Sequence, residues 1–375
     1  MTNPLRLIDL FAGAGGMTEG FESTGRFKTL VAVEHDKYAA ATYSLNHSAD
    51  RVYAGGIEDW LAESSVPEAD VIIGGPPCQG FSALGKQDVL DERNFLWKKY
   101  AETIIAAKPK YFILENVRQF LASPQFKELE QWTHPGGPLD TYALQPYLLN
   151  AADFGSFQAR VRTIVIGRLR ELPPVPEPVG PFRDNHRTVE QAFEGIDPRT
   201  DAIDFPQSAF EFEGSPMAGP YKTTQLHTTR NYTQLSLERF ESIPPGGNRF
   251  DIPFDLLAPC WKKHKTGSGD VMGRLRWEKP SVTIRTEFFK PEKGRYLHPE
   301  EDRAITHREA ARLQGFPDDY LWAGNKTAIA RQIGNAVPVE LAKYLADLIA
   351  DHNAQTSALP ASLPAALSQT NPGCI

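Results

Sequence analysis

The chain of 375 residues has only three cysteines, Cys78, Cys260 and Cys374. Three widely separated cysteines form neither a disulfide framework nor the paired spacing of a zinc site, so we expect no metal and a reducing compartment. The sequence also lacks a run of about 18 apolar residues and a signal-peptide pattern at its start. These absences predict a cytoplasmic protein without a membrane anchor.

Positive charge is in the minority, with 40 Lys and Arg against 47 Asp and Glu, a net charge of -7. This balance argues against a nonspecific nucleic-acid coat but leaves room for a local basic groove. Residues 257–298 hold ten Lys and Arg against four Asp and Glu, which makes them a basic island. The island predicts phosphate contacts, with a solvated surface face as the alternative.

With 41% hydrophobic residues the chain can bury a large core. Its first half alternates short apolar segments with helical ones, which predicts an α/β fold with a parallel sheet. The expected strands are residues 5–11, 29–33, 71–73, 111–114 and 163–167.

Five prolines between residues 173 and 181 predict a linker, because proline interrupts helices and central strands. Residues after the linker are irregular and loop-rich until helical periodicity returns at 308–313 and 339–350. We therefore expect a first domain of residues 1–175 completed by 304–351, and a smaller, irregular domain of residues 176–303. Residues 352–375, rich in Ala, Ser and Pro, are expected to be a disordered tail.

Residues 9–17 (DLFAGAGGM) form a glycine-rich turn between the first strand and a helix. Such a turn brings a ligand close to the backbone, but NAD, FAD and nucleotide sites use it as well, and some such turns bind nothing. Glu34 follows the second strand, nineteen residues after Gly15, where a carboxylate can accept both ribose hydroxyl protons. Together they predict a nucleoside cofactor.

Residues 74–82 (GGPPCQGFS) follow the third expected strand. Most lone cysteines are small buried hydrophobic residues, yet two prolines here hold Cys78 in a polar loop at the carboxyl end of a strand. The loop therefore predicts a thiolate nucleophile.

Residues 115–117 (ENV) end the neighbouring strand, so Glu115 could face Cys78 across one cleft and donate a proton to a ring nitrogen. Residues 158–162 (QARVR) precede the last strand, and at period two they offer several donors on one face. A helix-start acid and an exposed edge strand are the ordinary alternatives for these two segments.

In this order the motifs resemble those of the DNA (cytosine-5)-methyltransferase family of bacterial restriction-modification systems. Residues 308–317 (REAARLQGFP) and 332–338 (QIGNAVP) are similar to its two late motifs, so the resemblance spans residues 9–338. It implies a Rossmann-like S-adenosylmethionine-dependent methyltransferase domain with a smaller, irregular target-recognition domain.

The resemblance also implies roles for individual residues. Contacts to S-adenosyl-L-methionine, with S-adenosyl-L-homocysteine as product, fall on Asp9, Phe11, Gly13, Gly15, Glu34, His35, Ile57 and Asn335. The catalytic pocket falls on Cys78, Glu115, Arg160 and Arg162. DNA contacts fall on Gln79, Ser82, Lys262, Lys263, Lys265, Arg274 and Arg276. One position departs from the family, which commonly has an acid before Ile57 where this chain has Gly56, so that either Glu58, Asp59 or the backbone makes that contact.

The implied reaction is methyl transfer to C5 of a cytosine swung out of duplex DNA. Cys78 would add to C6, Glu115 would protonate or hydrogen-bond N3, and Arg160 or Arg162 would hold the base, with residues 81–97 as a lid. The expected protein is a monomer associated with the nucleoid, accompanied in function by a cognate restriction endonuclease. The sequence does not reveal the recognised DNA site.

Other enzymes share parts of this pattern. A tRNA cytosine-C5 methyltransferase has the same loops, and a non-catalytic DNA-binding relative would keep the fold. Amino-group methyltransferases have Asp or Asn before Pro-Pro, where this chain has Gly75. A zinc deaminase needs a Pro-Cys-x-x-Cys pair, which is absent from the sequence. Retention of both Cys78 and Glu115 favours a catalytic methyltransferase.

Overall fold

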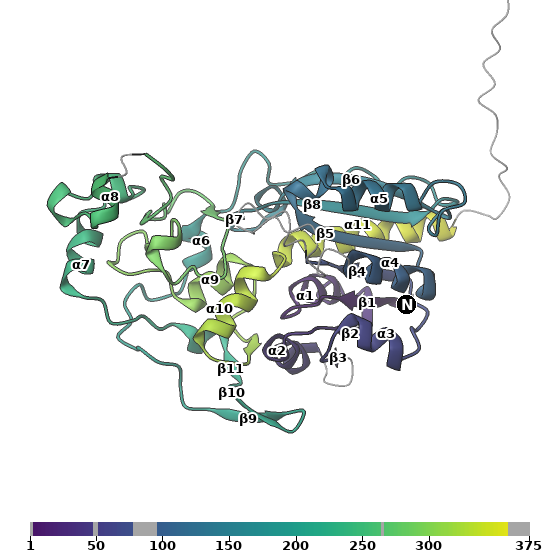
Figure 1. Ribbon diagram of the computed structural model, residues 1–375, viewed down its shortest axis with the longest axis horizontal. Helices are drawn as coiled ribbons and strands as arrows, with labels where there is room; N and C mark the ends of the chain where they lie inside the picture. Colours follow the sequence, from purple (N-terminus) through teal and green to yellow (C-terminus); the bar gives the residue numbers. More distant parts are fainter. Residues whose placement is uncertain (1–2, 48–51, 78–95, 264–265, 359–375) are drawn as a thin grey trace, which may run out of the picture.

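The structure is a computed structural model that describes residues 3–47, 52–77, 96–263 and 266–358. It has two lobes, a larger one built on a sheet and a smaller one of short helices and loops (Figure 1). No helix in these ranges is long and apolar enough to cross a membrane.

The sheet of the larger lobe has seven strands in the order β3-β2-β1-β4-β5-β8-β6. The strands are β1 (Leu5–Leu10), β2 (Phe27–Val33), β3 (Val52–Tyr53), β4 (Val71–Gly74), β5 (Tyr111–Val117), β6 (Tyr142–Asn150) and β8 (Val161–Leu169). The first five are parallel, and β8 runs antiparallel to both β5 and β6. This is the expected Rossmann-like α/β class.

Alternating side chains of the strands enter two cores, one on each face of the sheet. In β1, Leu7 packs with α1 and α11, whereas Ile8 packs with α3 and α4. The helices of this lobe are α1 (Gly16–Glu22), α2 (Lys37–His47), α3 (Ile57–Glu63), α4 (Leu96–Ala107), α5 (Pro124–Trp132) and α11 (Val339–Ala358). Near-continuous apolar strands are therefore required, because parallel sheets are covered on both faces.

The largest core of the smaller lobe combines residues between Val189 and Val339 with Ala14 of the turn after β1. The lobe contains helices α6 (Val189–Phe193), α7 (Gln234–Glu241), α8 (Pro259–Lys263), α9 (His307–Leu313) and α10 (Lys326–Asn335). Its strands pair two by two: β9 (Ala209–Phe212) with β10 (Ser215–Ala218), β11 (Tyr221–Lys222) with β13 (Leu321–Trp322), and β12 (Ser281–Val282) with β7 (Gln158–Ala159).

The path of the chain between the lobes differs in two respects from the expectation. We expected residues 304–351 to complete the larger lobe, but α9 and α10 lie in the core of the smaller one, and α11 packs on the sheet. We also expected disorder from residue 352. Residues 352–358 instead continue α11, where His352 Nδ1 lies 2.8 Å from the hydroxyl of buried Tyr111. Residues 359–375 lie outside the described ranges.

Candidate active site

The loops that follow β1, β2, β4 and β5 lie along one edge of the sheet, because these strands are parallel neighbours. The chain leaves β1 toward β2 on one side and reaches β4 on the other, so the strand order reverses between β1 and β4. Ligands of open α/β sheets bind at such a reversal, beyond the carboxyl ends of the strands. All motifs predicted from the first half of the sequence, other than residues 158–162, begin at this edge.

The chain leaves extended structure at Phe11, which has φ 56°, so β1 ends at Leu10, one residue before the predicted strand end. Gly13 has φ 57° and would find no atom within 4 Å of an added Cβ, so its side faces open space. Gly15 is different: an added Cβ would lie 2.7 Å from His47 Nε2 and 2.9 Å from the Tyr320 hydroxyl. Gly13 thus keeps a surface open for a ligand, whereas Gly15 allows close packing between distant segments.

Glu34 reaches from the end of β2 to the glycine-rich turn. Its Oε2 accepts from the Gly13 backbone N–H at 2.7 Å, and its Oε1 accepts from the Asp36 N–H at 2.6 Å. Burial raises the pKa of Glu34, while these two backbone donors act in the opposite sense. The carboxylate is held in place, and each oxygen keeps acceptor capacity for hydroxyl donors.

Asp9 does not contact the cofactor surface as we predicted, because its side chain is only 1% exposed. It accepts a hydrogen bond from Thr18 Oγ1 at 2.7 Å, and that hydroxyl also lies 2.9 Å from the Tyr43 hydroxyl. Burial raises the pKa of Asp9 to about 8. Asp9 therefore stabilises the turn through its hydrogen bond with Thr18. We correct its assignment from a ligand contact to a structural role.

Three further residues predicted to contact the cofactor lie near this edge. His35 is exposed directly after Glu34, and Asn335 is exposed at the end of α10. The backbone next to Asn335 meets the turn, since a Cβ on Gly16 would lie 2.8 Å from the Val337 carbonyl oxygen. Ile57 is buried at the first position of α3.

The missing acid at Gly56 has a structural counterpart. A Cβ placed on Gly56 would lie 3.1 Å from Asp59 Oδ2 and 3.5 Å from Glu58 Oε2. The two carboxylates of the first turn of α3 therefore crowd the space that a side chain at position 56 would enter.

Glu115, in β5, pairs with Arg162, in β8, across neighbouring antiparallel strands. Arg162 Nε lies 3.0 Å from Glu115 Oε1, and the two side chains are 17% and 13% exposed. The other carboxylate oxygen, Oε2, lies 3.0 Å from the position of a Cβ on Gly75, at the end of β4. Glu115 is thus oriented by an arginine on one side and faces the start of the predicted nucleophile loop on the other.

Asn116, the middle residue of the ENV motif, to which no role was assigned from the sequence, ties the same loop to β5. Its Nδ2 donates to the Pro76 carbonyl oxygen at 2.9 Å, and its side chain is buried. A polar residue at the end of an otherwise apolar strand was the available signal. Cys78, Gln79 and Ser82 and most of the expected lid lie outside the described residues, so the described part of the loop ends at Pro77.

Arg160, predicted to be catalytic, is 4% exposed and acts between the lobes. Its Nη1 donates to the carbonyl oxygens of Ile284 at 3.1 Å and Gly334 at 3.2 Å. Burial lowers the pKa of this guanidinium to about 9. Gln158 Nε2 likewise donates to Gln314 Oε1 at 2.6 Å. We therefore correct Arg160 to a positioning residue, and Arg162 is the arginine that reaches Glu115.

The basic island is less exposed than its composition suggests. Arg274 is 3% exposed, and its guanidinium donates to four backbone carbonyl oxygens and to Asp302 Oδ1. A buried arginine with its donors already paired cannot also bind a phosphate, so the predicted DNA contact of Arg274 is wrong.

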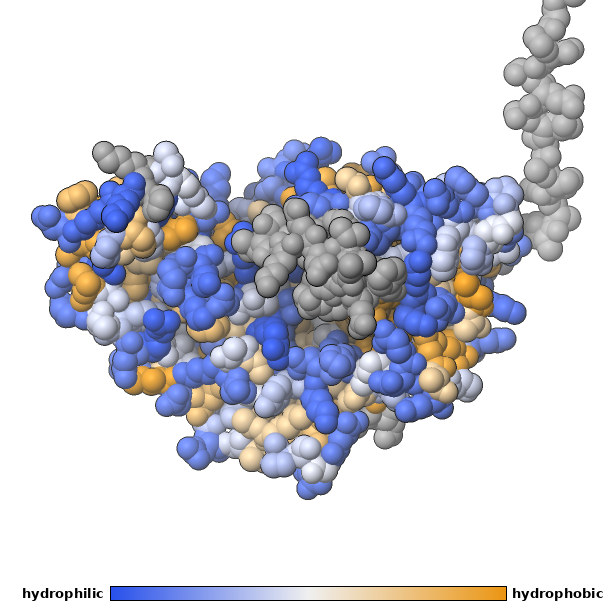
Figure 2. Space-filling model, viewed as in Figure 1, coloured by the Kyte–Doolittle hydropathy of each residue, from blue (hydrophilic) through white to orange (hydrophobic). Residues whose placement is uncertain are grey.

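Lys263 and Arg276 are exposed, and Lys262 lies 5.1 Å from the centre of the Phe254 ring. Lys265 lies outside the described residues. On the face drawn in Figure 2, hydrophilic residues prevail and apolar ones are scattered among them. Over the described ranges no cluster of three His, Cys, Asp or Glu is arranged to hold a metal ion.

Comparison with known sequences gives consistent matches over most of the chain. The profile of the family described as C-5 cytosine-specific DNA methylase matches residues 5–351. The Type II methyltransferase M1.HphI of Haemophilus parahaemolyticus is 34% identical over 355 residues, covering 92% of this chain and 86% of the relative. M.Sau96I of Staphylococcus aureus is 34% identical over 351 residues, covering 90% and 74%.

Comparison with solved structures supports the same fold. A prophage-encoded E. coli protein described as a DNA modification methyltransferase matches with a TM-score of 0.68 and 24% identity, covering 93% of this chain and 99% of that one. The Dnmt2 methyltransferase of S. pombe matches with a TM-score of 0.54 and 18% identity, with the same coverage.

Proposed function

This chain belongs to the C-5 cytosine-specific DNA methylase family, and from that premise we propose that it methylates C5 of a flipped-out cytosine through a covalent Cys78 adduct. The chain is thus a DNA (cytosine-5)-methyltransferase of the bacterial restriction-modification type. The observation that carries the mechanistic proposal is the Glu115 carboxylate, paired with Arg162 and facing Gly75. It supports a base pocket between β4 and β5.

The chemistry requires a nucleophile and a proton donor on the same ring. C5 of cytosine attacks an electrophile poorly until a nucleophile adds across the neighbouring double bond. In the proposal the Cys78 thiolate adds to C6 while Glu115 hydrogen-bonds or protonates N3, which makes C5 enamine-like. Once C5 carries the methyl group, water can take up the C5 proton as Cys78 leaves as a thiolate, and N3 returns its proton to Glu115, which restores the ring.

Arg162 has an orienting role in this scheme. Its bond to Glu115 Oε1 directs Oε2 toward the Gly75 side, where the base would enter. Asn116 fixes the Pro76 carbonyl and so sets the start of the Cys78 loop relative to Glu115. Because C6 is inaccessible in stacked DNA, the cytosine must leave the helix to reach this pocket.

Proteins of this family use S-adenosylmethionine, and the residues at the β1 turn fit such a molecule. Open space beside Gly13, the fixed Glu34 carboxylate, and exposed His35 and Asn335 would hold its nucleoside part. Bound there, S-adenosylmethionine supplies an electrophilic methyl group. Phe11, with its left-handed backbone, would contribute a ring to the same surface.

For the position where the family commonly has an acid, we propose that Asp59 replaces the side chain absent from Gly56. The support is its Oδ2, which lies 3.1 Å from a Cβ at position 56, closer than Glu58. Asp59→Asn should raise the KM for S-adenosylmethionine by about tenfold, the effect of one charge-assisted hydrogen bond, and leave kcat nearly unchanged. Glu63→Gln, farther along α3, is the matched control. An unchanged KM for Asp59→Asn would exclude the proposal that Asp59 takes the place of the missing acid at position 56.

The DNA surface is proposed to include Lys262, Lys263 and Arg276, with the lysines on phosphates and the arginine able to contact guanine. Changing Lys262 and Lys263 together to Ala should weaken DNA binding and lower the salt slope of log Kd by about two. If the DNA affinity and its salt slope were unaltered, α8 would not be part of the DNA interface. Control substitutions at Lys98 and Lys99, in α4, keep the same loss of charge.

The covalent step has a direct test with duplex DNA that carries 5-fluorocytosine at the target. The wild-type protein should form a denaturation-resistant adduct that requires S-adenosylmethionine, and Cys78→Ala should form none. An adduct that persists in Cys78→Ala would contradict the assignment of Cys78 as the nucleophile. The target site comes first from mapping methylated cytosines in DNA of cells that express the protein.

The choice of substrate and partners is tested separately. Duplex DNA should accept methyl groups and tRNA should not, because we propose that the smaller lobe is a DNA-recognition module. Preferential methylation of tRNA would reverse this proposal. We further propose that the protein acts as a monomer and protects its site from a cognate restriction endonuclease, which digestion of methylated DNA would test.

A further inference from the structure

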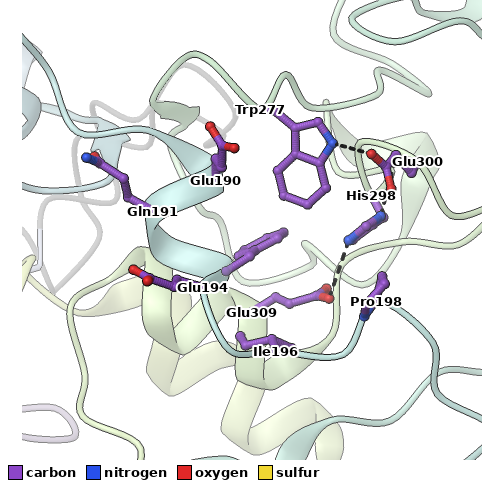
Figure 3. Close-up of a pocket in the computed structure, with 10 residues that line it drawn as sticks. Glu190, Gln191, Glu194, Ile196, Pro198, Trp277, His298, Glu300 and Glu309 are labelled. Atoms are coloured by element: carbon purple, nitrogen blue, oxygen red, sulfur yellow. Dashed lines mark hydrogen bonds and ion pairs between the residues drawn. The ribbon is translucent and has the colours of Figure 1, made fainter.

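A cavity of about 630 Å³ lies in the smaller lobe, apart from the candidate active site (Figure 3). α6 and the residues after it form one side, and Trp277, His298, Glu300 and Glu309 form the other. Among the described residues that line it, none is Lys or Arg, whereas Glu190, Glu194 and Glu300 are exposed at its rim. The exposed carboxylates therefore favour a cation over a phosphate at the rim.

Its inner wall is aromatic. The Phe193 ring stacks on His298 at 5.7 Å between centres and meets Trp277 edge-on at 5.8 Å. Trp277 Nε1 donates to Glu300 Oε1 at 2.8 Å, which holds this carboxylate beside the indole (Figure 3). A carboxylate next to aromatic rings suits an organic cation, which is attracted by both the charge and the ring electrons.

His298 adds a donor for which the described residues provide no hydrogen-bond acceptor. The side chain is 1% exposed, and its Nδ1 accepts from the backbone N–H groups of Glu300 and Glu301. Burial lowers the pKa of His298 to about 4, so at neutral pH its single ring proton is on Nε2.

In the described parts of the chain this Nε2–H makes no hydrogen bond. Glu309 Oε1, at 3.8 Å, is too distant and already accepts from Arg303 at 2.6 Å. Because His298 lines the cavity, its free N–H can be satisfied by an acceptor on a ligand. The site thus combines anionic acceptors at the rim, an aromatic wall and one buried donor.

We propose that this cavity binds an arginine or lysine residue. The cationic head would lie among Glu190, Glu194 and Glu300, the aliphatic stem would pack on Trp277, and the residue's carbonyl oxygen would accept from His298 Nε2. The site is independent of the proposed methyl transfer, since none of its residues belongs to the candidate active site.

The proposal is tested by calorimetric titration of the full chain with three probes. N-acetylarginine amide should bind, and its neutral near-isostere N-acetylcitrulline amide should bind at least about tenfold more weakly, since it lacks the charge. Butylguanidinium carries the same single charge without a carbonyl group, so it should bind less tightly than the arginine derivative. Binding should weaken as salt is added, because the rim carboxylates are exposed.

Variants decide whether the cavity is the site. Glu190→Gln combined with Glu194→Gln should weaken binding of the arginine derivative by about tenfold, while the control Glu292→Gln, outside the cavity, should not. His298→Phe keeps a ring and should abolish the preference for the arginine derivative over butylguanidinium, with circular dichroism confirming the fold. Equal binding of arginine and citrulline derivatives, or the same affinity in the double variant, would overturn the proposal.

Discussion

At the scale of single residues, the two arginines of the QARVR segment have different surroundings, so substituting each of them should have a different effect. Arg162→Gln removes the group that orients Glu115, so kcat should fall by about 100-fold with little change in thermal stability. Arg160→Gln leaves two buried carbonyl oxygens short of a donor, so it should cost about 2–3 kcal/mol of stability.

The comparison uses methylation kinetics and thermal unfolding, with exposed Arg118→Gln as the control. A larger loss of kcat in folded Arg160→Gln than in Arg162→Gln would restore Arg160 to the catalytic group and refute our correction.

Asp9 predicts a dependence of stability on pH. Burial raises its pKa from 3.8 to about 8, so the folded protein keeps a proton that the unfolded chain releases above pH 3.8. Its contribution to stability is therefore full below about pH 4 and is lost as the pH rises toward about 8. Asp9→Asn retains an acceptor for Thr18 without titrating. Urea unfolding at pH 5 and pH 8.5 should show a smaller decline in the variant, and parallel declines would contradict this reading.

At the scale of elements, the contact of α1 with α11 depends on Gly20. A Cβ there would lie 2.5 Å from Ala342 Cβ and 2.7 Å from the Val339 carbonyl oxygen. Alanine ordinarily favours a helix over glycine by about 1 kcal/mol. In Gly20→Ala the clash should exceed that gain, so we expect a net destabilisation of about 1–3 kcal/mol.

Thermal unfolding checks this prediction, with Gly269→Ala as a control whose added Cβ has its nearest neighbour at 3.5 Å. The KM for S-adenosylmethionine should also rise in Gly20→Ala, because α1 begins at the glycine-rich turn. A variant as stable as the wild type would show that the helices can separate without loss.

At the scale of the whole molecule, buried histidines make the smaller lobe sensitive to acid. Burial lowers the pKa of both His298 and His307 to about 4, from 6.5. The unfolded chain therefore binds more protons between about pH 6.5 and pH 4, and the stability that these groups contribute is lost as the pH falls through that window.

His307→Phe tests the effect, since His307 already packs among Phe205, Phe288 and Phe289. The fall in unfolding free energy from pH 7 to pH 4.5 should be smaller in the variant than in the wild type. Because Asp9 acts in the opposite sense over part of this range, the difference between the two proteins is the quantity to compare. Identical falls would mean that His307 does not contribute.

The positions of β1, β2, β4, β5 and β8, and the loops at the carboxyl ends of the parallel strands, could be predicted from the sequence, because apolar runs, glycines and prolines act locally, whereas β3 and β6 were not predicted. Leu5–Leu10 and Val71–Gly74 differ by one residue from the expected strands, and Glu34, Glu115 and the start of the Cys78 loop follow strands as expected. The family itself was evident from the order of the motifs. These features depend on residues that are close together in the chain, so they can be predicted from the sequence.

Only the tertiary structure determined which residues each charged side chain contacts. Arg162 lies beside Glu115 and Arg160 beside Ile284 and Gly334, although the two arginines are two residues apart. Asp9 and Arg274 are buried, and α9 and α10 belong to the smaller lobe. Their partners are distant in sequence, and burial depends on how lobes and helices pack. Composition and residue spacing do not specify these contacts between distant segments. The roles of these residues could therefore be assigned only from the folded structure.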